Sequence, residues 1–153
     1  MPNRKNTRTF INADTRQARG EPTHHQQELM ETVVAACAII AHADGHADLS
    51  ERRKLLAMMR RVPPLAGFSR EDLDHEFAMH ELAFATDPDE ARDHAMKLVG
   101  MSPMHKTEVQ MVMRACQEVL EADGILHPLE YAALHEIGSA LKPQSVGNQA
   151  AHP

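Results

Sequence analysis

At 153 residues the chain is long enough for one domain with a substantial core and too short for two. Aromatic residues make up only 3% of it while methionines number 10, which favours an aliphatic core of packed helices over a β-sandwich. The net charge is −6, and residues 21–153 hold 21 acidic against 11 basic side chains, which argues against nucleic acid as a partner.

Six helices are predicted between two polar tails. We expect residues 1–22 to form a flexible basic tail and residues 143–153 to form a C-terminal tail. Apolar residues at helical spacing, together with helix-start signals, place the helices in chain order at 24–43, 48–62, 69–85, 87–100, 102–121 and 127–141. Since no segment alternates between apolar and polar residues, as a half-buried strand does, we expect an all-α fold. It should be one compact domain of six or seven helices over residues 23–142.

The segments 36–51 and 115–130 are two copies of one repeat. Each reads Ala-Cys, five residues, Ala-Asp-Gly, five residues, Glu, and the copies are 79 residues apart. In both copies the first half closes a long helix and the second half opens the next, as in a duplicated αα-hairpin. We therefore expect two pseudo-symmetric helix–turn–helix halves whose acidic turns lie near each other.

The carboxylates of the repeat are the candidate functional groups. Asp44 and Asp123 each follow two apolar residues of the preceding helix, one four residues earlier and one seven residues earlier. Glu51 and Glu130 each precede two apolar residues of the following helix, one four residues later and one seven residues later. Helical spacing predicts that all four point toward the core, where carboxylates need hydrogen-bond donors, cations or a metal as partners.

Two interpretations of the turns stay open. In the first the turns are architectural, because Gly45 and Gly124 supply left-handed C-caps and the two Glu residues cap the following helices. This interpretation does not explain why Asp44 and Asp123 continue an apolar stripe. In the second interpretation the two turns share a cation that the four carboxylates bind.

A metal site made of Asp44, Glu51, Asp123 and Glu130 would favour Ca²⁺, Mg²⁺ or Mn²⁺. It is not an EF-hand, because Gly follows Asp directly and no twelve-residue loop of alternating acids is present. Histidines near the turns would shift the preference toward Zn²⁺. The additional candidate ligands are Asp48, His42, His46 and His127.

The acidic Ala-Asp-Gly turn followed by Glu, repeated in a helical chain of this size, resembles the tellurite-resistance TerB family. It also resembles the TerB-like domain that precedes the J-domain in a DnaJ-type membrane-anchored co-chaperone. The resemblance covers residues 25–141, and Asp44, Glu51, Asp123 and Glu130 match the family's acidic positions. It implies an all-helical fold of two pseudo-symmetric halves, acidic residues that chelate a metal, and a role in bacterial stress and tellurite-resistance systems without an enzymatic reaction.

The leading hypothesis is a metal-binding TerB-like protein that acts through other, in part membrane-associated, proteins of such a system. The alternative is a helical interaction or regulatory module, as in a co-chaperone, whose acidic turns are purely structural. No nucleophile elbow, phosphate-binding loop or Rossmann glycine pattern is present, so a hydrolase or thiol-redox enzyme ranks third. With no membrane-spanning stretch or signal peptide in the sequence, we expect a cytoplasmic protein, peripheral to the inner membrane only through partners.

Cysteine, histidine and methionine side chains outside the turns are expected to be structural. Cys37 and Cys116 occupy equivalent places on apolar stripes, which favours core packing over thiol chemistry or a disulfide. The methionines, Met79 among them, are predicted to fill the core rather than line a peptide-binding groove. Most histidines are expected singly on solvated helix surfaces: His75, His80, His94, His105 and His135.

Overall fold

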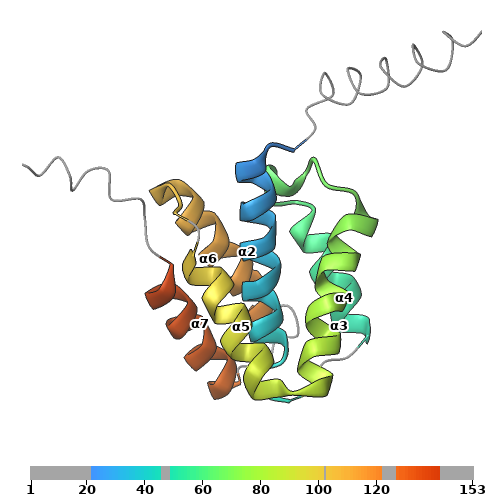
Figure 1. Cartoon of the computed structure of the whole chain (residues 1–153), viewed down its shortest axis with the longest axis vertical. Helices are drawn as coiled ribbons and strands as arrows, with labels where there is room; N and C mark the ends of the chain where they lie inside the picture. The colour runs from blue at the N-terminus through green and yellow to red at the C-terminus, as the bar shows by residue number, and fades with distance from the viewer. Residues whose placement is uncertain (1–21, 46–48, 102, 122–126, 142–153) are drawn as a thin grey trace, which may run out of the picture.

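The computed structural model describes residues 22–45, 49–101, 103–121 and 127–141 (Figure 1). Its helices, in chain order, are α2 (His24–Ala41), α3 (Leu49–Met59), the short 3₁₀ helix η1 (Pro63–Leu65), α4 (Arg70–Thr86), α5 (Pro88–Met101), α6 (Lys106–Glu121) and α7 (Pro128–Ala140). These described ranges contain no strand, so the predicted all-α fold is confirmed. The predicted tails lie outside them, apart from Pro22, and none of the described helices is both long and apolar enough to span a bilayer.

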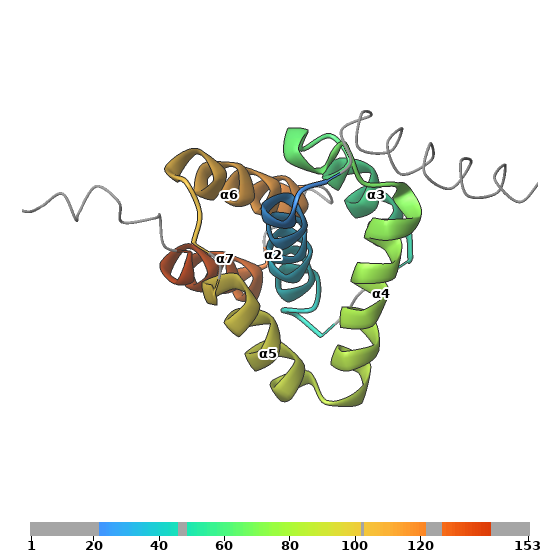
Figure 2. The ribbon, with the colours of Figure 1, turned by 45° about the horizontal axis from the view of Figure 1, so that its top comes forward.

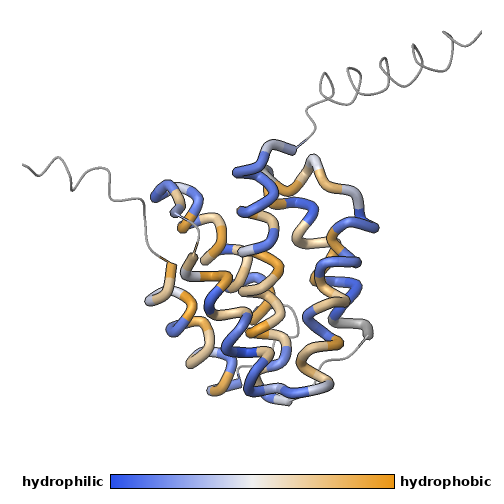
Figure 3. The backbone as a smooth tube through the Cα atoms, in the orientation of Figure 1, coloured by the Kyte–Doolittle hydropathy of each residue, from blue (hydrophilic) through white to orange (hydrophobic). Residues whose placement is uncertain are grey.

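Helix α2 runs through the middle of the domain and contacts each of the other α-helices named above (Figure 2). Every residue from 29 to 40 is buried except Glu31, which is half-buried. The sequence suggested a one-sided stripe, but this stretch is apolar on all faces, and a helix of that kind must be covered all round. Figure 3 shows the matching change along α2, from a hydrophilic N-terminal end to an apolar remainder.

The helices around α2 each bury one face. In α6 the buried residues stand at positions i, i+3, i+4 and i+8, which form one face of an amphipathic helix: Val112, Ala115, Cys116 and Leu120. Helices α2 and α6 begin the two copies of the repeat and pack against each other. The two copies are therefore paired in space but not equally buried, because α2 is covered on all sides and α6 on one.

Three predicted helix boundaries are wrong by two residues or more. The helix predicted to reach residue 62 ends at Met59. The helix predicted to reach residue 43 ends earlier, at Ala41. The helix predicted to begin at residue 102 begins at Lys106. The later start arises because Met104 is held in the core, 1% exposed, and because Glu108 accepts a hydrogen bond from the backbone N–H of His105 (2.9 Å), which fixes the helix start there.

Arginines tie the outer helices to one another. Arg52 of α3 donates from Nε to Oε1 of Glu81 in α4 (2.7 Å), and its Nη2 lies 2.5 Å from Oδ1 of Asp74 in the same helix. Arg92 of α5 pairs with Glu136 of α7 at 2.6 Å. Helix α3, which follows the first acidic turn, is thereby held against α4.

Helix α4 leaves two large apolar side chains in solvent. Met79 is 58% exposed and Leu82 is 71% exposed. The prediction that Met79 fills the core is wrong, because the buried face of α4 follows Leu73, Phe77 and Phe84 and Met79 lies off that face.

Candidate metal centre

The first acidic turn follows directly from the end of α2. The backbone N–H of Ala43 donates to the oxygen of Ile40 (3.1 Å), and that of Gly45 donates to the oxygen of His42 (3.1 Å). Gly45 has φ +82°, the left-handed conformation expected of a C-cap glycine. Because α2 ends before Asp44, this backbone turn, and not the helical phase used in the sequence argument, sets the direction of the Asp44 carboxylate.

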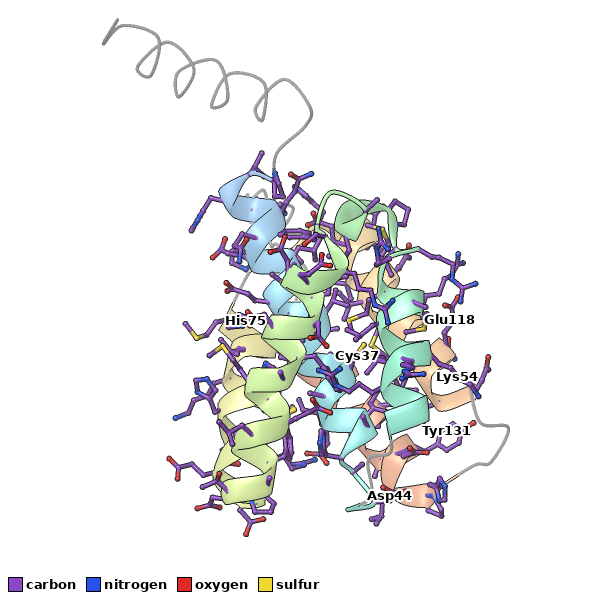
Figure 4. All side chains as sticks on the ribbon, turned by 90° about the vertical axis from the view of Figure 1, so that its right-hand side faces the viewer. Cys37, Asp44, Lys54, His75, Glu118 and Tyr131 are labelled. Carbon is purple, nitrogen blue, oxygen red and sulfur yellow. The ribbon has the colours of Figure 1, made fainter. Side chains whose placement is uncertain are left out.

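Asp44 lies beside the second copy of the repeat. Its Oδ2 is 3.9 Å from Nε2 of His127, and the two side chains are 22% and 37% exposed. His127 occupies the N-cap position of α7 but makes no capping hydrogen bond through its side chain. Figure 4 shows Asp44 at the end of the molecule away from the N-terminal end of α2. The expected approach of the two copies is thus seen at this pair of residues.

Glu130 places a carboxylate in the first turn of α7. Its backbone N–H donates to the carbonyl oxygen of His127 (3.0 Å), and the residue is only 9% exposed. Burying a carboxylate this deeply is costly unless hydrogen bonds or a cation stabilise it. Asp44, His127 and Glu130 therefore bring oxygen and nitrogen ligands to one end of the helix bundle.

Four other predicted ligands are not placed by the structure. Asp48, His46 and Asp123 lie outside the described residues. For Glu51 only the backbone is described, in the first turn of α3. Of the predicted ligand set, the described residues bring Asp44 together with the start of α7.

His42, an additional candidate ligand, has a packing role at the end of α2. Its Nδ1 lies 2.9 Å from the carbonyl oxygen of Ala38. Since a carbonyl oxygen can only accept, Nδ1 carries a proton, and Nε2 is the one nitrogen left for a metal. The ring stacks on Phe84 of α4, with centroids 4.4 Å apart and planes 7° from parallel.

His80 departs from the expectation of a solvated surface histidine. It is 6% exposed on the face of α4 that packs into the domain. Burial lowers its pKa below the usual value, and the neighbouring His94 and His42 lower that pKa further. The prediction is wrong for His80 because this residue lies at helical spacing from Leu73, Phe77 and Phe84, on the one face of α4 that is buried.

Cys37 and Cys116 lie against each other between α2 and α6. Both are free and fully buried, as predicted for core cysteines. The hydrogen bond between the two thiols, and then burial, raise the pKa of Cys116 well above its usual range. A thiol in this state is a poor nucleophile, since the thiolate is the reactive form.

A second group of ligand-type side chains, absent from the predicted site, lies at the other end of α2. His25, His105 and Glu108 each offer one ligand atom within 4.8 Å of the others, and no other trio of His, Cys, Asp or Glu does so within the described part of the chain. His25 and Glu108 are 83 residues apart, so no periodicity links them. The one local signal was the spacing of His105 and Glu108 at a helix start.

These features define an all-helical domain with a duplicated acidic turn and ligand-type side chains at the meeting point of the two copies. The family model for tellurite resistance protein TerB matches residues 30–149, which include both copies, and the chain belongs to this family. The resemblance noted in the repeat is thereby confirmed. Comparison with curated proteins and with solved structures gives no significant match.

Proposed function

We propose that this TerB protein binds a divalent cation between its two acidic turns and serves a tellurite-resistance or stress-response system through protein partners, without catalysing a reaction. The observation that carries the proposal is the 3.9 Å approach of Asp44, from the first turn, to His127 of the second copy. Glu130 adds a nearly buried carboxylate in the first turn of α7, close in sequence to His127. Asp44 and His127 thus bring one donor from each half of the repeat to one region.

The separation of these donors suits a shared ion. Two ligands bound to one cation at about 2.0 to 2.6 Å lie roughly 3 to 5 Å apart, so the Asp44–His127 distance needs little adjustment. Carboxylate oxygens favour Ca²⁺, Mg²⁺ or Mn²⁺, and participation of His127 shifts the preference toward Mn²⁺ or Zn²⁺. A cation held there would neutralise the carboxylates and join the α2–α3 and α6–α7 hairpins, which presents partners with one rigid surface.

Calorimetric titration of chelator-treated protein with Mn²⁺ and Ca²⁺ tests this proposal. We expect binding by the wild type, loss of binding when Asp44→Asn and Asp123→Asn are combined, and weaker binding by Glu130→Gln. Asp93→Asn, at an exposed position of α5, is the matched control and should bind as the wild type does. If the wild type and the double variant titrate alike, the proposal is rejected. Elemental analysis of protein purified without chelators would name the ion.

A second candidate is a helical interaction module whose turns are purely structural. The left-handed Gly45 supports it, because a C-cap accounts for the glycine of the turn without a ligand. Met79 and Leu82, both exposed on α4, support it as contact residues for a protein partner. Absence of cation binding in the titration would favour this candidate. In either case we propose a cytoplasmic protein that reaches the inner membrane only through partners.

A further inference from the structure

We propose that His25, His105 and Glu108 form a second metal site, of the kind Zn²⁺ prefers, at the end of α2 opposite the acidic turns. Nε2 of His25 lies 2.8 Å from Oε2 of Glu108. The rings of His25 and His105 have centroids 6.0 Å apart and planes inclined by 64°. One ligand atom of each residue lies within 4.8 Å of the others. This site is independent of the one proposed at the turns.

Local structure fixes where each ligand lies. Helix α2 begins with a capping box between Thr23 and Gln26, which sets the first turn that carries His25. At the start of α6 the carbonyl oxygen of His105 accepts the N–H of Glu108 (2.9 Å). In return Oε1 of Glu108 accepts the N–H of His105 (2.9 Å), which leaves Oε2 directed at His25. A carboxylate already held by the backbone is pre-oriented for an ion.

The electrostatics make Glu108 the required ligand. Both α2 and α6 begin at this site, and the N-terminal end of a helix carries partial positive charge that opposes a cation. Burial alone would raise the pKa of Glu108, but the hydrogen bonds from the His105 backbone and from His25 outweigh it and lower that pKa. Glu108 is the one carboxylate among the three residues, so it supplies the negative charge that a dication needs.

Two imidazoles and one carboxylate are a ligand set that Zn²⁺ and its neighbours Co²⁺, Ni²⁺ and Cu²⁺ bind in preference to Ca²⁺ or Mg²⁺. With bonds of about 2.0 to 2.2 Å, tetrahedral zinc ligands lie roughly 3.3 to 3.6 Å apart. The ligand atoms of His25 and Glu108 lie 2.8 Å apart, and all three lie within 4.8 Å of one another. Both histidines are exposed, so their rings can rotate toward tetrahedral spacing. A plain hydrogen bond between two helix starts would account for His25 and Glu108, but not for the third ligand atom beside them.

Zinc titration of the full, untagged chain tests this inference. Asp44→Asn and Asp123→Asn are included in the parent protein, so that the turns cannot contribute ligands. We expect one equivalent of Zn²⁺ to bind, and affinity to fall about tenfold or more in His105→Ala and in Glu108→Gln. His24→Ala is the matched control, because His24 is the neighbouring histidine but its side chain is 89% exposed and outside the trio. It should bind zinc as the parent does.

Cobalt gives an independent readout. Co²⁺ in place of Zn²⁺ should produce visible absorption bands of a four-coordinate ion in the parent and lose them in His25→Ala and His105→Ala. Unchanged helical circular dichroism in these variants would assign the loss to the missing ligand rather than to unfolding. Zinc affinity in His105→Ala equal to that of the parent, or an equal loss in His24→Ala, would overturn the inference. The Mn²⁺ titration of His105→Ala with Asp44 intact separately reports the site at the turns.

Discussion

Replacing Arg52 by Met should destabilise the domain by about 1 to 2 kcal/mol. The guanidinium makes a 2.7 Å hydrogen bond with Glu81, a 2.5 Å ion pair with Asp74, and lies 5.9 Å from the centre of the Phe77 ring. Charge-assisted hydrogen bonds contribute about 1.5 to 3 kcal/mol and exposed ion pairs about 0.2 to 1 kcal/mol. Since Arg52 is 21% exposed and its partners are 30% and 45% exposed, we expect a value between these limits.

The charge of Arg52 is secure throughout the accessible pH range. Burial opposes it, but the hydrogen bonds and charges of Glu81 and Asp74 outweigh burial and raise the pKa of Arg52. Methionine keeps an apolar stem and removes the guanidinium, together with its contact with the Phe77 ring. The loss should therefore be electrostatic and should shrink in 1 M salt, where the Debye length is about 3 Å.

The assay is urea unfolding followed by helical circular dichroism, with a chelator present. Arg53→Met is the matched control, because Arg53 is the exposed neighbour in α3, and it should change the free energy of unfolding by less than about 0.5 kcal/mol. A double-mutant cycle with Glu81→Gln should give a coupling free energy of about 1 kcal/mol. An equal loss of unfolding free energy in Arg52→Met and Arg53→Met, with no coupling to Glu81, would refute the reasoning that the Arg52–Glu81 contact holds α3 in place.

Two further predictions concern buried groups. Burial, and then His94 and His42, lower the pKa of His80 in the folded chain, so below about pH 6.5 the unfolded chain takes up a proton that the folded chain resists. The free energy of unfolding should hence be fully retained above pH 7 and fall toward pH 5. In chelator-treated His80→Leu this fall should be smaller than in the wild type, by about 1.4 kcal/mol for each unit by which the pKa of His80 is lowered. The same pH dependence in the variant and the wild type would contradict this. Cys37 and Cys116 are fully buried, so a thiol reagent should label them only at the rate of unfolding, whereas labelling within the mixing time would show native reactivity.

Local patterns in the sequence determined the fold class and the family. Helical spacing, capping residues and proline positions depend on neighbours within a few residues, and the helices they predicted were found with small errors at the ends. The duplicated Ala-Asp-Gly turn was also visible without a structure, and it pointed to TerB. The boundary at residue 43 was wrong because the apolar pattern continues past the point where the backbone of α2 turns at His42.

Tertiary packing decided which ligand-type side chains meet. His127 lies beside Asp44 because the two copies of the repeat pack together, whereas His42, closer to Asp44 in sequence, stacks on Phe84 instead. The burial of His80, by contrast, follows a pattern within one helix, because His80 lies at helical spacing from Leu73, Phe77 and Phe84 on the buried face of α4. The group of His25, His105 and Glu108 has no sequence signature across its 83-residue gap, since only the packing of α2 against α6 brings those residues together.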